Sequence, residues 1–134
     1  MKILVVDDEA MLVLLDDSTF VANNIFDVKI ELIHTSHDAP YSVGFIISQE
    51  DKSIVYVTDT GYINRKYLNK MVNKDIYVIE SNHDEVMLMD GPYPRFLKER
   101  VISDRGHLSN KTTAKNLKKI NVRSEWVSLL ATRY

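Results

Sequence analysis

Short apolar runs separated by polar turns dominate the first part of the chain, and they predict β-strands. Residues 2–6 and 11–15 are the first two runs, and each is followed by acidic residues. In residues 26–33 apolar and polar side chains alternate, which is typical of a strand with one buried face. We expect His34 and His37 to lie at the end of this third strand.

The middle of the chain predicts a hairpin followed by a βαβ passage. Residues 43–48 and 53–57 are rich in β-branched and aromatic side chains and flank a polar turn at 49–52, which favours an antiparallel hairpin. Residues 64–72 carry apolar side chains at helical spacing, and a strand is predicted at 76–79. We expect the hairpin to bring Asp59 close to the loop that carries His37.

The last part of the chain predicts two helices and a strand. Residues 96–102 form the first predicted helix, which has a basic face, and residues 111–120 form the second, with Ser109 as its N-cap. The apolar run at 126–131 predicts a final strand. Strands that alternate with helices indicate an α/β sandwich in which loops at one sheet edge build the site.

Composition narrows the function classes without selecting one. The chain has 134 residues, which predicts a single domain, and a net charge of -2 that draws it neither to nucleic acid nor to an anionic membrane. It has no cysteine, which excludes a disulfide framework and a thiolate metal site and favours the cytoplasm. Acidic residues at positions 7–9 interrupt the first apolar run, so neither a targeting segment nor a membrane span is expected there.

Polar side chains gather where the predicted strands end, and all four histidines of the chain are among them. The residues in these clusters are His34, His37, Asp38, Asp59, Glu80, His83, Asp84, Asp104 and His107. Imidazole and carboxylate together suit zinc, manganese or iron. Asp59 is the best candidate for a bridging ligand because a carboxylate can bind two ions and an imidazole cannot.

Each of these residues also has an ordinary structural interpretation. A histidine at a strand end is commonly capped or exposed, and Asp59 is followed by Thr60 and Gly61 in a sequence that favours a turn. His83 could form a surface pair with Asp84, and the basic residues of 95–105 could be a solvated helix face. His107 could be only a loop residue ahead of a capped helix. Composition and spacing alone leave these interpretations open.

Several motifs in residues 12–120 nevertheless resemble one family in their order and spacing. The main motifs are Thr35-Ser36-His37-Asp38, Thr58-Asp59-Thr60-Gly61, Glu80-Ser81-Asn82-His83-Asp84 and Gly106-His107-Leu108-Ser109-Asn110. They are similar to those of the bacterial YycJ/WalJ/VicX group. This group is a branch of the metallo-β-lactamase-fold hydrolases related to tRNase Z and RNase J.

The resemblance implies an α/β fold, namely a partial metallo-β-lactamase αβ/βα sandwich. Residues 1–134 would form a single truncated domain, mostly the second half of that fold, with one mixed or antiparallel sheet and helices packed on it. The family uses two divalent metals, zinc or manganese, and a metal-activated water to cleave phosphodiesters. By resemblance, the substrate is nucleic acid and the activity is that of an exonuclease.

The resemblance also implies roles for particular residues. His37 resembles the single histidine ligand of one metal motif, and Asp59 resembles the bridging aspartate. Glu80 and His83 fall on positions that support the metals or catalysis. His107 resembles the histidine that contacts the scissile phosphate or donates a proton to the leaving oxygen, and its place before a helix N-terminus suits an anion.

Two motifs of the family are missing from the sequence. No His-x-His-x-Asp-His motif is present, and no histidine follows the last predicted strand. A two-metal site needs more ligands than the two named here. We therefore expect a chain that binds zinc or manganese weakly and is inactive or nearly so as a nuclease. Exposed apolar surface and self-association are expected as well.

Two other interpretations come from different classes of protein. Residues 1–9 resemble the start of a response-regulator receiver domain, in which an acidic pair holds Mg²⁺ and Asp59 would be the phosphoacceptor. Against this interpretation, no helix is predicted directly after Glu9 and no lysine closes a fifth strand. The third interpretation is a non-catalytic remnant or a binding module that uses the basic residues of 95–105.

Overall fold

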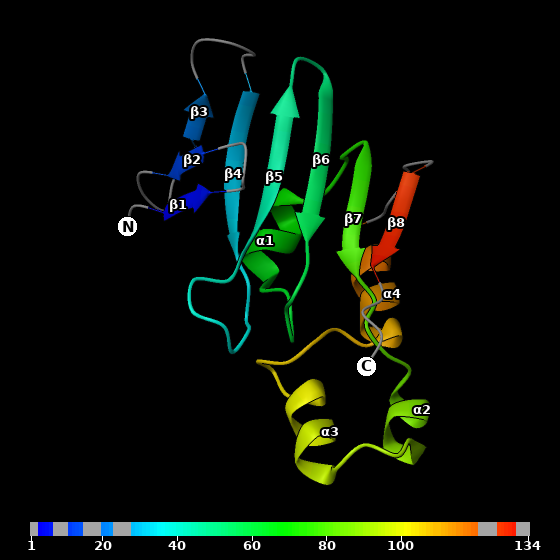
Figure 1. Cartoon of the computed structure of the whole chain (residues 1–134). Coiled ribbons are helices and arrows are strands. Elements are labelled where there is room, and N and C mark those ends of the chain that lie inside the picture. The colour runs from blue at the N-terminus through cyan, green and yellow to red at the C-terminus, as the bar shows by residue number, and fades with distance from the viewer. Residues whose placement is uncertain (1–2, 7–10, 15–19, 23–27, 121–125, 131–134) are drawn as a thin grey trace.

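Six of the eight strands that the structure describes form one sheet (Figure 1). The computed structural model describes residues 3–6, 11–14, 20–22, 28–120 and 126–130, and it describes side chains for residues 28–120. Strands β1 (Ile3–Val6) and β2 (Met11–Leu14) pair with each other antiparallel. The large sheet has the order β3 (Phe20–Ala22), β4 (Val28–His34), β5 (Val43–Gln49), β6 (Lys52–Val57), β7 (Ile76–Glu80) and β8 (Trp126–Leu130).

The large sheet is mixed, which is one of the two arrangements predicted. Strands β3 to β6 pair antiparallel, whereas β6, β7 and β8 pair parallel. Strands β4, β6, β7 and β8 therefore run in the same direction, and their C-terminal ends lie at one edge of the sheet (Figure 1). The predicted hairpin is confirmed: Gln49 pairs with Lys52 across a two-residue turn in which Glu50 has a φ of 52°.

Among the described residues, four helices connect the parallel strands. They are α1 (Arg65–Lys70), α2 (Glu85–Asp90), α3 (Arg95–Ile102) and α4 (Asn110–Lys119). The predicted N-cap of α4 is confirmed, since the Ser109 hydroxyl accepts a hydrogen bond of 3.2 Å from the Thr112 amide. The helix predicted at 64–72 is shorter than expected. It ends at Lys70, and Asn73 then takes a φ of 55° before β7 begins.

Helices α1 and α4 cover one face of the sheet. The connections from β6 to β7 and from β7 to β8 step in the same direction, so right-handed crossovers place both helices on the same side. The core between helices and sheet includes Val55, Val57, Tyr77, Ile79, Tyr67, Leu68, Met71 and Ile120. The buried hydroxyl of Tyr77 donates to the Met71 carbonyl at 2.7 Å, so β7 is tied to the end of α1.

The opposite face of the sheet is apolar too. Tyr56 lies between Phe45 and Val78 in the strand register, and Ile54 lies between Ile47 and Ile76. Tyr56 is 41% exposed, and the other five residues are partly exposed. Strands that are apolar on both faces are typical of a sheet that is covered on both sides. The self-association expected from the sequence stays a prediction.

The topology does not fit the receiver-domain interpretation. A receiver domain has a doubly wound, parallel sheet. Here β1 pairs antiparallel with β2, and β4 pairs antiparallel with β5. The acidic residues 7–9 lie outside the described residues. Among the described helices, none combines the length and the apolar character that crossing a membrane requires.

Candidate metal centre

Three side chains that could bind a metal ion meet at the sheet edge where β4, β6 and β7 end. They are His37 from the loop after β4, Asp59 just after β6 and His107 just before α4, and one candidate ligand atom from each lies within 4.8 Å of the others. The two imidazole rings are 4.9 Å apart between centroids. The structure thus brings His37 and Asp59 together, and it adds His107, for which the resemblance implied a catalytic role.

A backbone carbonyl fixes the orientation of the His37 ring. Its Nδ1 atom lies 3.0 Å from the carbonyl oxygen of Gly106, and because a carbonyl can only accept, Nδ1 carries the hydrogen. Nε2 is then the ring nitrogen that is left to face a metal ion, and it lies 3.4 Å from an Asp38 carboxylate oxygen. Ring nitrogens that bind metals typically have this arrangement, in which the other nitrogen donates to a fixed acceptor.

Asp59 combines an unusual backbone conformation with an accessible carboxylate. Its φ is 49°, in the left-handed region that aspartate tolerates better than most residues, so it is a turn residue as well as a candidate ligand. Its carbonyl oxygen accepts from the Ser42 hydroxyl at 3.4 Å. Its side chain is 51% exposed, and one carboxylate oxygen lies 3.7 Å from Nδ1 of His107.

His107 forms a buried pair with Glu80. The His107 Nδ1 atom lies 2.5 Å from a Glu80 carboxylate oxygen, and the Glu80 residue is only 2% exposed. This hydrogen bond raises the pKa of His107 above its ordinary value, although burial acts in the opposite direction. Since Nδ1 donates to Glu80, Nε2 is the nitrogen that could bind a metal ion or a phosphate oxygen.

The carboxylate of Glu80 also joins three segments of the chain. Its second oxygen accepts from the backbone amides of Thr60 at 3.0 Å and Leu108 at 3.1 Å. The backbone carbonyl of Glu80 accepts from the Thr113 hydroxyl at 2.6 Å. One buried side chain thus holds the end of β6, the end of β7 and the start of α4 in place around His107.

The sequence analysis assigned no role to Thr60, although it lies within one of the quoted motifs. Besides its amide bond to Glu80, its hydroxyl accepts from the Ser36 amide at 3.0 Å and donates to the Tyr62 carbonyl at 2.7 Å. Thr60 is 1% exposed. It therefore links the loop of His37 to the end of β7, a role that spacing within the motif could not reveal.

His83 lies beside this group but outside it. A cavity of about 230 Å³ is lined by Gly61, His83, Glu85, Met89, Ile102, His107, Ser109 and Thr112. Burial lowers the pKa of His83. Its Nδ1 atom lies 3.2 Å from the Asn82 side-chain oxygen, and its carbonyl accepts from the Asn110 amide. His83 and His107 thus line the same cavity.

The remaining polar residues of the predicted clusters have structural partners or lie outside the group. The His34 ring is tilted against Tyr67 at 6.5 Å between centroids. Asp38 pairs with Arg100 at 2.5 Å, and this contact lowers the pKa of Asp38. Asp84 caps α2 by accepting from two backbone amides, and Asp104 is exposed. For these residues the ordinary structural interpretation fits the structure.

Raising the pH is expected to weaken the fold through His107. The folded chain favours the protonated ring, so its contribution to the free energy of unfolding is fully present below the ordinary pKa of 6.5 and is lost as the pH rises through the raised value. In the variant Glu80→Gln, burial remains and the carboxylate is lost, so the pKa of His107 should fall. NMR titration of the imidazole protons measures both values, and equal values in the two proteins would contradict the assignment.

A family profile described as the beta-lactamase superfamily domain matches residues 5–127 of this chain. Two curated relatives align with it over 88 residues, or 66% of its length. The exodeoxyribonuclease WalJ of Streptococcus pneumoniae serotype 2 (strain D39 / NCTC 7466) is 43% identical, and the exodeoxyribonuclease YycJ of Bacillus anthracis is 34% identical. Each alignment covers 33% of the relative, so the chain spans about a third of the length of these relatives.

A solved structure gives an independent comparison of the fold. The short form of human tRNase Z (ELAC1) matches with a TM-score of 0.53 and 15% sequence identity, over 95% of this chain and 46% of that one. At this identity the likeness concerns the fold alone. It confirms the partial metallo-β-lactamase fold that the motifs implied.

Proposed function

We propose that this chain, which belongs to the beta-lactamase superfamily, supplies part of a metal-dependent phosphodiesterase site that acts on DNA. The observation that carries the proposal is the convergence of His37, Asp59 and His107 at one sheet edge, with ligand atoms within 4.8 Å of one another. The names of the two exodeoxyribonuclease relatives support DNA as the substrate. A nucleic-acid substrate and the absence of cysteine favour the cytoplasm.

The donor atoms of this group fit a zinc or manganese ion. The Nε2 atom of His37, whose Nδ1 atom lies against a fixed carbonyl acceptor, and the Asp59 carboxylate together offer a mixed nitrogen and oxygen ligand set. We assign His37 and Asp59 to the metal. When bound, such an ion lowers the pKa of a water molecule and polarises a phosphoryl oxygen.

His107 and Glu80 have complementary roles in this proposal. The raised pKa of His107 keeps its ring protonated to a higher pH than that of an ordinary histidine, so Nε2 can donate a proton to the leaving oxygen. Glu80 acts through His107, because its carboxylate orients the ring and stabilises the charged form. His83 lines the same cavity, where it could support the bound phosphate.

The described group is smaller than a complete two-metal site. The chain contains four histidines and no His-x-His-x-Asp-His motif, and a two-metal site clamps its substrate with more ligands than these. We propose that the residues of this chain form part of a larger domain and that further ligands lie outside this sequence. The chain by itself is then expected to bind metal weakly and to show background nuclease activity.

Calorimetric titration with zinc or manganese tests the metal centre. We expect weak uptake by the parent chain and at least about a tenfold loss of affinity in His37→Ala and in Asp59→Asn, since the first removes a ligand and the second replaces a charged carboxylate with a neutral amide. His34→Ala is the matched control, because His34 undergoes the same chemical change at the end of β4 but contacts Tyr67 instead of the metal group. Its affinity should equal that of the parent.

Three results would contradict the proposal. Equal losses in His34→Ala and His37→Ala would show that the binding is not at this group. No uptake by the parent at any metal concentration would favour the non-catalytic interpretation. Release of nucleotides from a 5′-phosphorylated duplex by the chain alone would show that the site needs no further ligands.

A further inference from the structure

Helices α1 and α4 carry only positive charges. Their charged residues are Arg65, Lys66, Lys70, Lys111, Lys115, Lys118 and Lys119. The whole chain has 19 acidic and 17 basic residues, so the absence of any acidic residue from these two helices is a local feature. Both helices pack on the same face of the sheet, so their charges belong to one side of the molecule (Figure 1).

The four lysines of α4 form a stripe along its outer side. Lys111, Lys115, Lys118 and Lys119 follow helical spacing, and all four are exposed. The opposite side of the helix is buried through Thr113 and Asn116. The stripe begins four residues after His107, so it leads away from the candidate metal centre along the helix.

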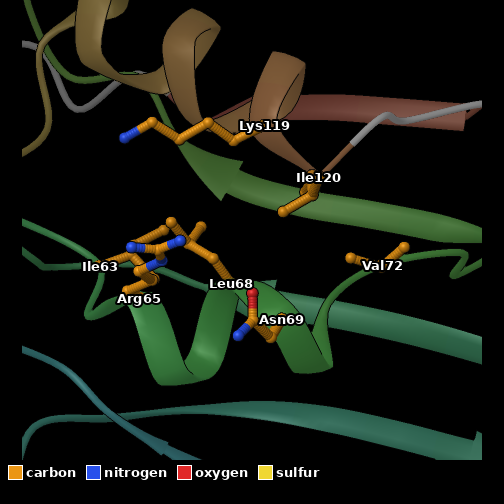
Figure 2. Close-up of a pocket in the computed structure, with 7 residues that line it drawn as sticks. All are labelled: Ile63, Arg65, Leu68, Asn69, Val72, Lys119 and Ile120. Atoms are coloured by element: carbon orange, nitrogen blue, oxygen red, sulfur yellow. The ribbon is translucent and has the colours of Figure 1, made fainter.

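The far end of the stripe reaches a groove between α1 and α4. This cavity of about 450 Å³ is lined by Ile63, Arg65, Leu68, Asn69, Val72, Lys119 and Ile120 (Figure 2). Figure 2 shows the Arg65 and Lys119 side chains reaching towards the same end of the groove, next to Ile63. Two cations from different helices thus flank a partly apolar groove.

Arg65 and the lysines of α4 differ from other basic residues on the surface in their ion pairs. On α3, Arg95 pairs with Glu99 at 2.7 Å, one helical turn away, and Lys70 of α1 pairs with Glu31 at 3.3 Å. Within the described part of the chain, Arg65 and the four lysines of the stripe form no ion pair. Like charges at this spacing repel each other and disfavour the helix. A polyanion would relieve that repulsion.

We propose that the α1–α4 groove and the lysine stripe of α4 bind the sugar-phosphate backbone of DNA. The inference rests on the proposed function and adds to it a path for the substrate that leads to His107. The cations offer phosphate contacts, which position a nucleic acid without reading its sequence. The apolar floor of the groove offers contact to the sugars that lie between the phosphates.

Fluorescence anisotropy with the full chain tests this surface. The probe is a fluorescein-labelled DNA duplex of about 20 base pairs, and EDTA is present so that the metal centre makes no contribution. The double variant Arg65→Glu/Lys119→Glu is expected to bind the duplex at least about tenfold more weakly. The logarithm of its affinity should also fall less steeply with the logarithm of the salt concentration, by the slope that about two phosphate contacts contribute. Circular dichroism checks that the variant is folded.

The double variant Lys29→Glu/Lys52→Glu is the matched control. It changes the net charge by the same amount at the starts of β4 and β6, the sheet edge opposite the candidate metal centre, where both lysines pair with neighbouring acidic residues. Its DNA affinity should stay close to that of the parent. Equal losses in the two double variants would overturn the proposal, as would a parent chain that does not bind the probe.

The two proposals fail in different measurements. If the α1–α4 variant binds DNA as well as the parent, the groove is not the DNA surface, and the metal titration still decides the proposed function. If His37→Ala loses metal uptake but keeps its DNA affinity in EDTA, both proposals are supported.

Discussion

Replacing Glu80 with alanine is expected to lower the free energy of unfolding by about 3–5 kcal/mol, the cost of breaking a buried charged pair. The substitution removes the acceptor for His107 and leaves the amides of Thr60 and Leu108 without their buried partner. Urea denaturation followed by circular dichroism measures the loss. Because Glu80 also holds the Thr60 amide directly after Asp59, the same variant should bind metal more weakly than the parent.

Glu99→Ala is the control for this experiment. It removes the same side chain from the exposed surface of α3, where Glu99 pairs with Arg95, and an exposed pair of this kind contributes less than about 1 kcal/mol. A loss in Glu80→Ala no larger than in Glu99→Ala would show that the buried carboxylate does not hold the three segments together.

The second large effect is expected at Gly61, where the variant Gly61→Ala should cost about 2–3 kcal/mol of stability. A methyl group at this position would lie 2.2 Å from the Asp104 carbonyl oxygen and 2.5 Å from that of Ser103. The Gly61 amide also donates to the Ser36 carbonyl at 2.7 Å. The added methyl group must therefore push apart the loops that carry Asp59 and His107.

Metal affinity distinguishes this effect from a general loss of stability. Gly61→Ala should bind metal more weakly even under conditions in which it is fully folded, because the distances between the ligands change. In Gly91→Ala, the added carbon would lie 3.0 Å from its nearest neighbour, the Met87 carbonyl oxygen, which needs only a small adjustment. Unchanged metal affinity in folded Gly61→Ala would contradict the predicted displacement.

The position of the site could be inferred from the sequence because it depends on strand ends. His37 follows the alternating strand β4, and Asp59 follows the second strand of a recognisable hairpin. Strand β5 pairs antiparallel with both β4 and β6, so β4 and β6 run in the same direction and the two residues lie at one sheet edge. The N-cap of α4 was also predictable, because Ser109 and the helix that it caps are neighbours in sequence.

Contacts between distant segments could not be inferred from the sequence. The hydrogen bond from His37 to the Gly106 carbonyl depends on how the chain returns after α3, and no side-chain pattern marks a backbone acceptor. The same holds for the amide of Thr60, which finds its partner on the next strand of the sheet. Strand β3 was not predicted because its three residues are too few to show a period of two.

The hydrogen bonds around the candidate metal centre close large loops of the chain. The bond from His37 to Gly106 joins residues 69 positions apart, and that from His107 to Glu80 joins residues 27 positions apart. Closing each of these loops lowers the conformational entropy of the chain before the contact can form. The β5–β6 hairpin and the helices have a smaller entropy cost because they form from neighbouring residues. Only a chain in which these long-range contacts have formed therefore holds the His37, Asp59 and His107 side chains together.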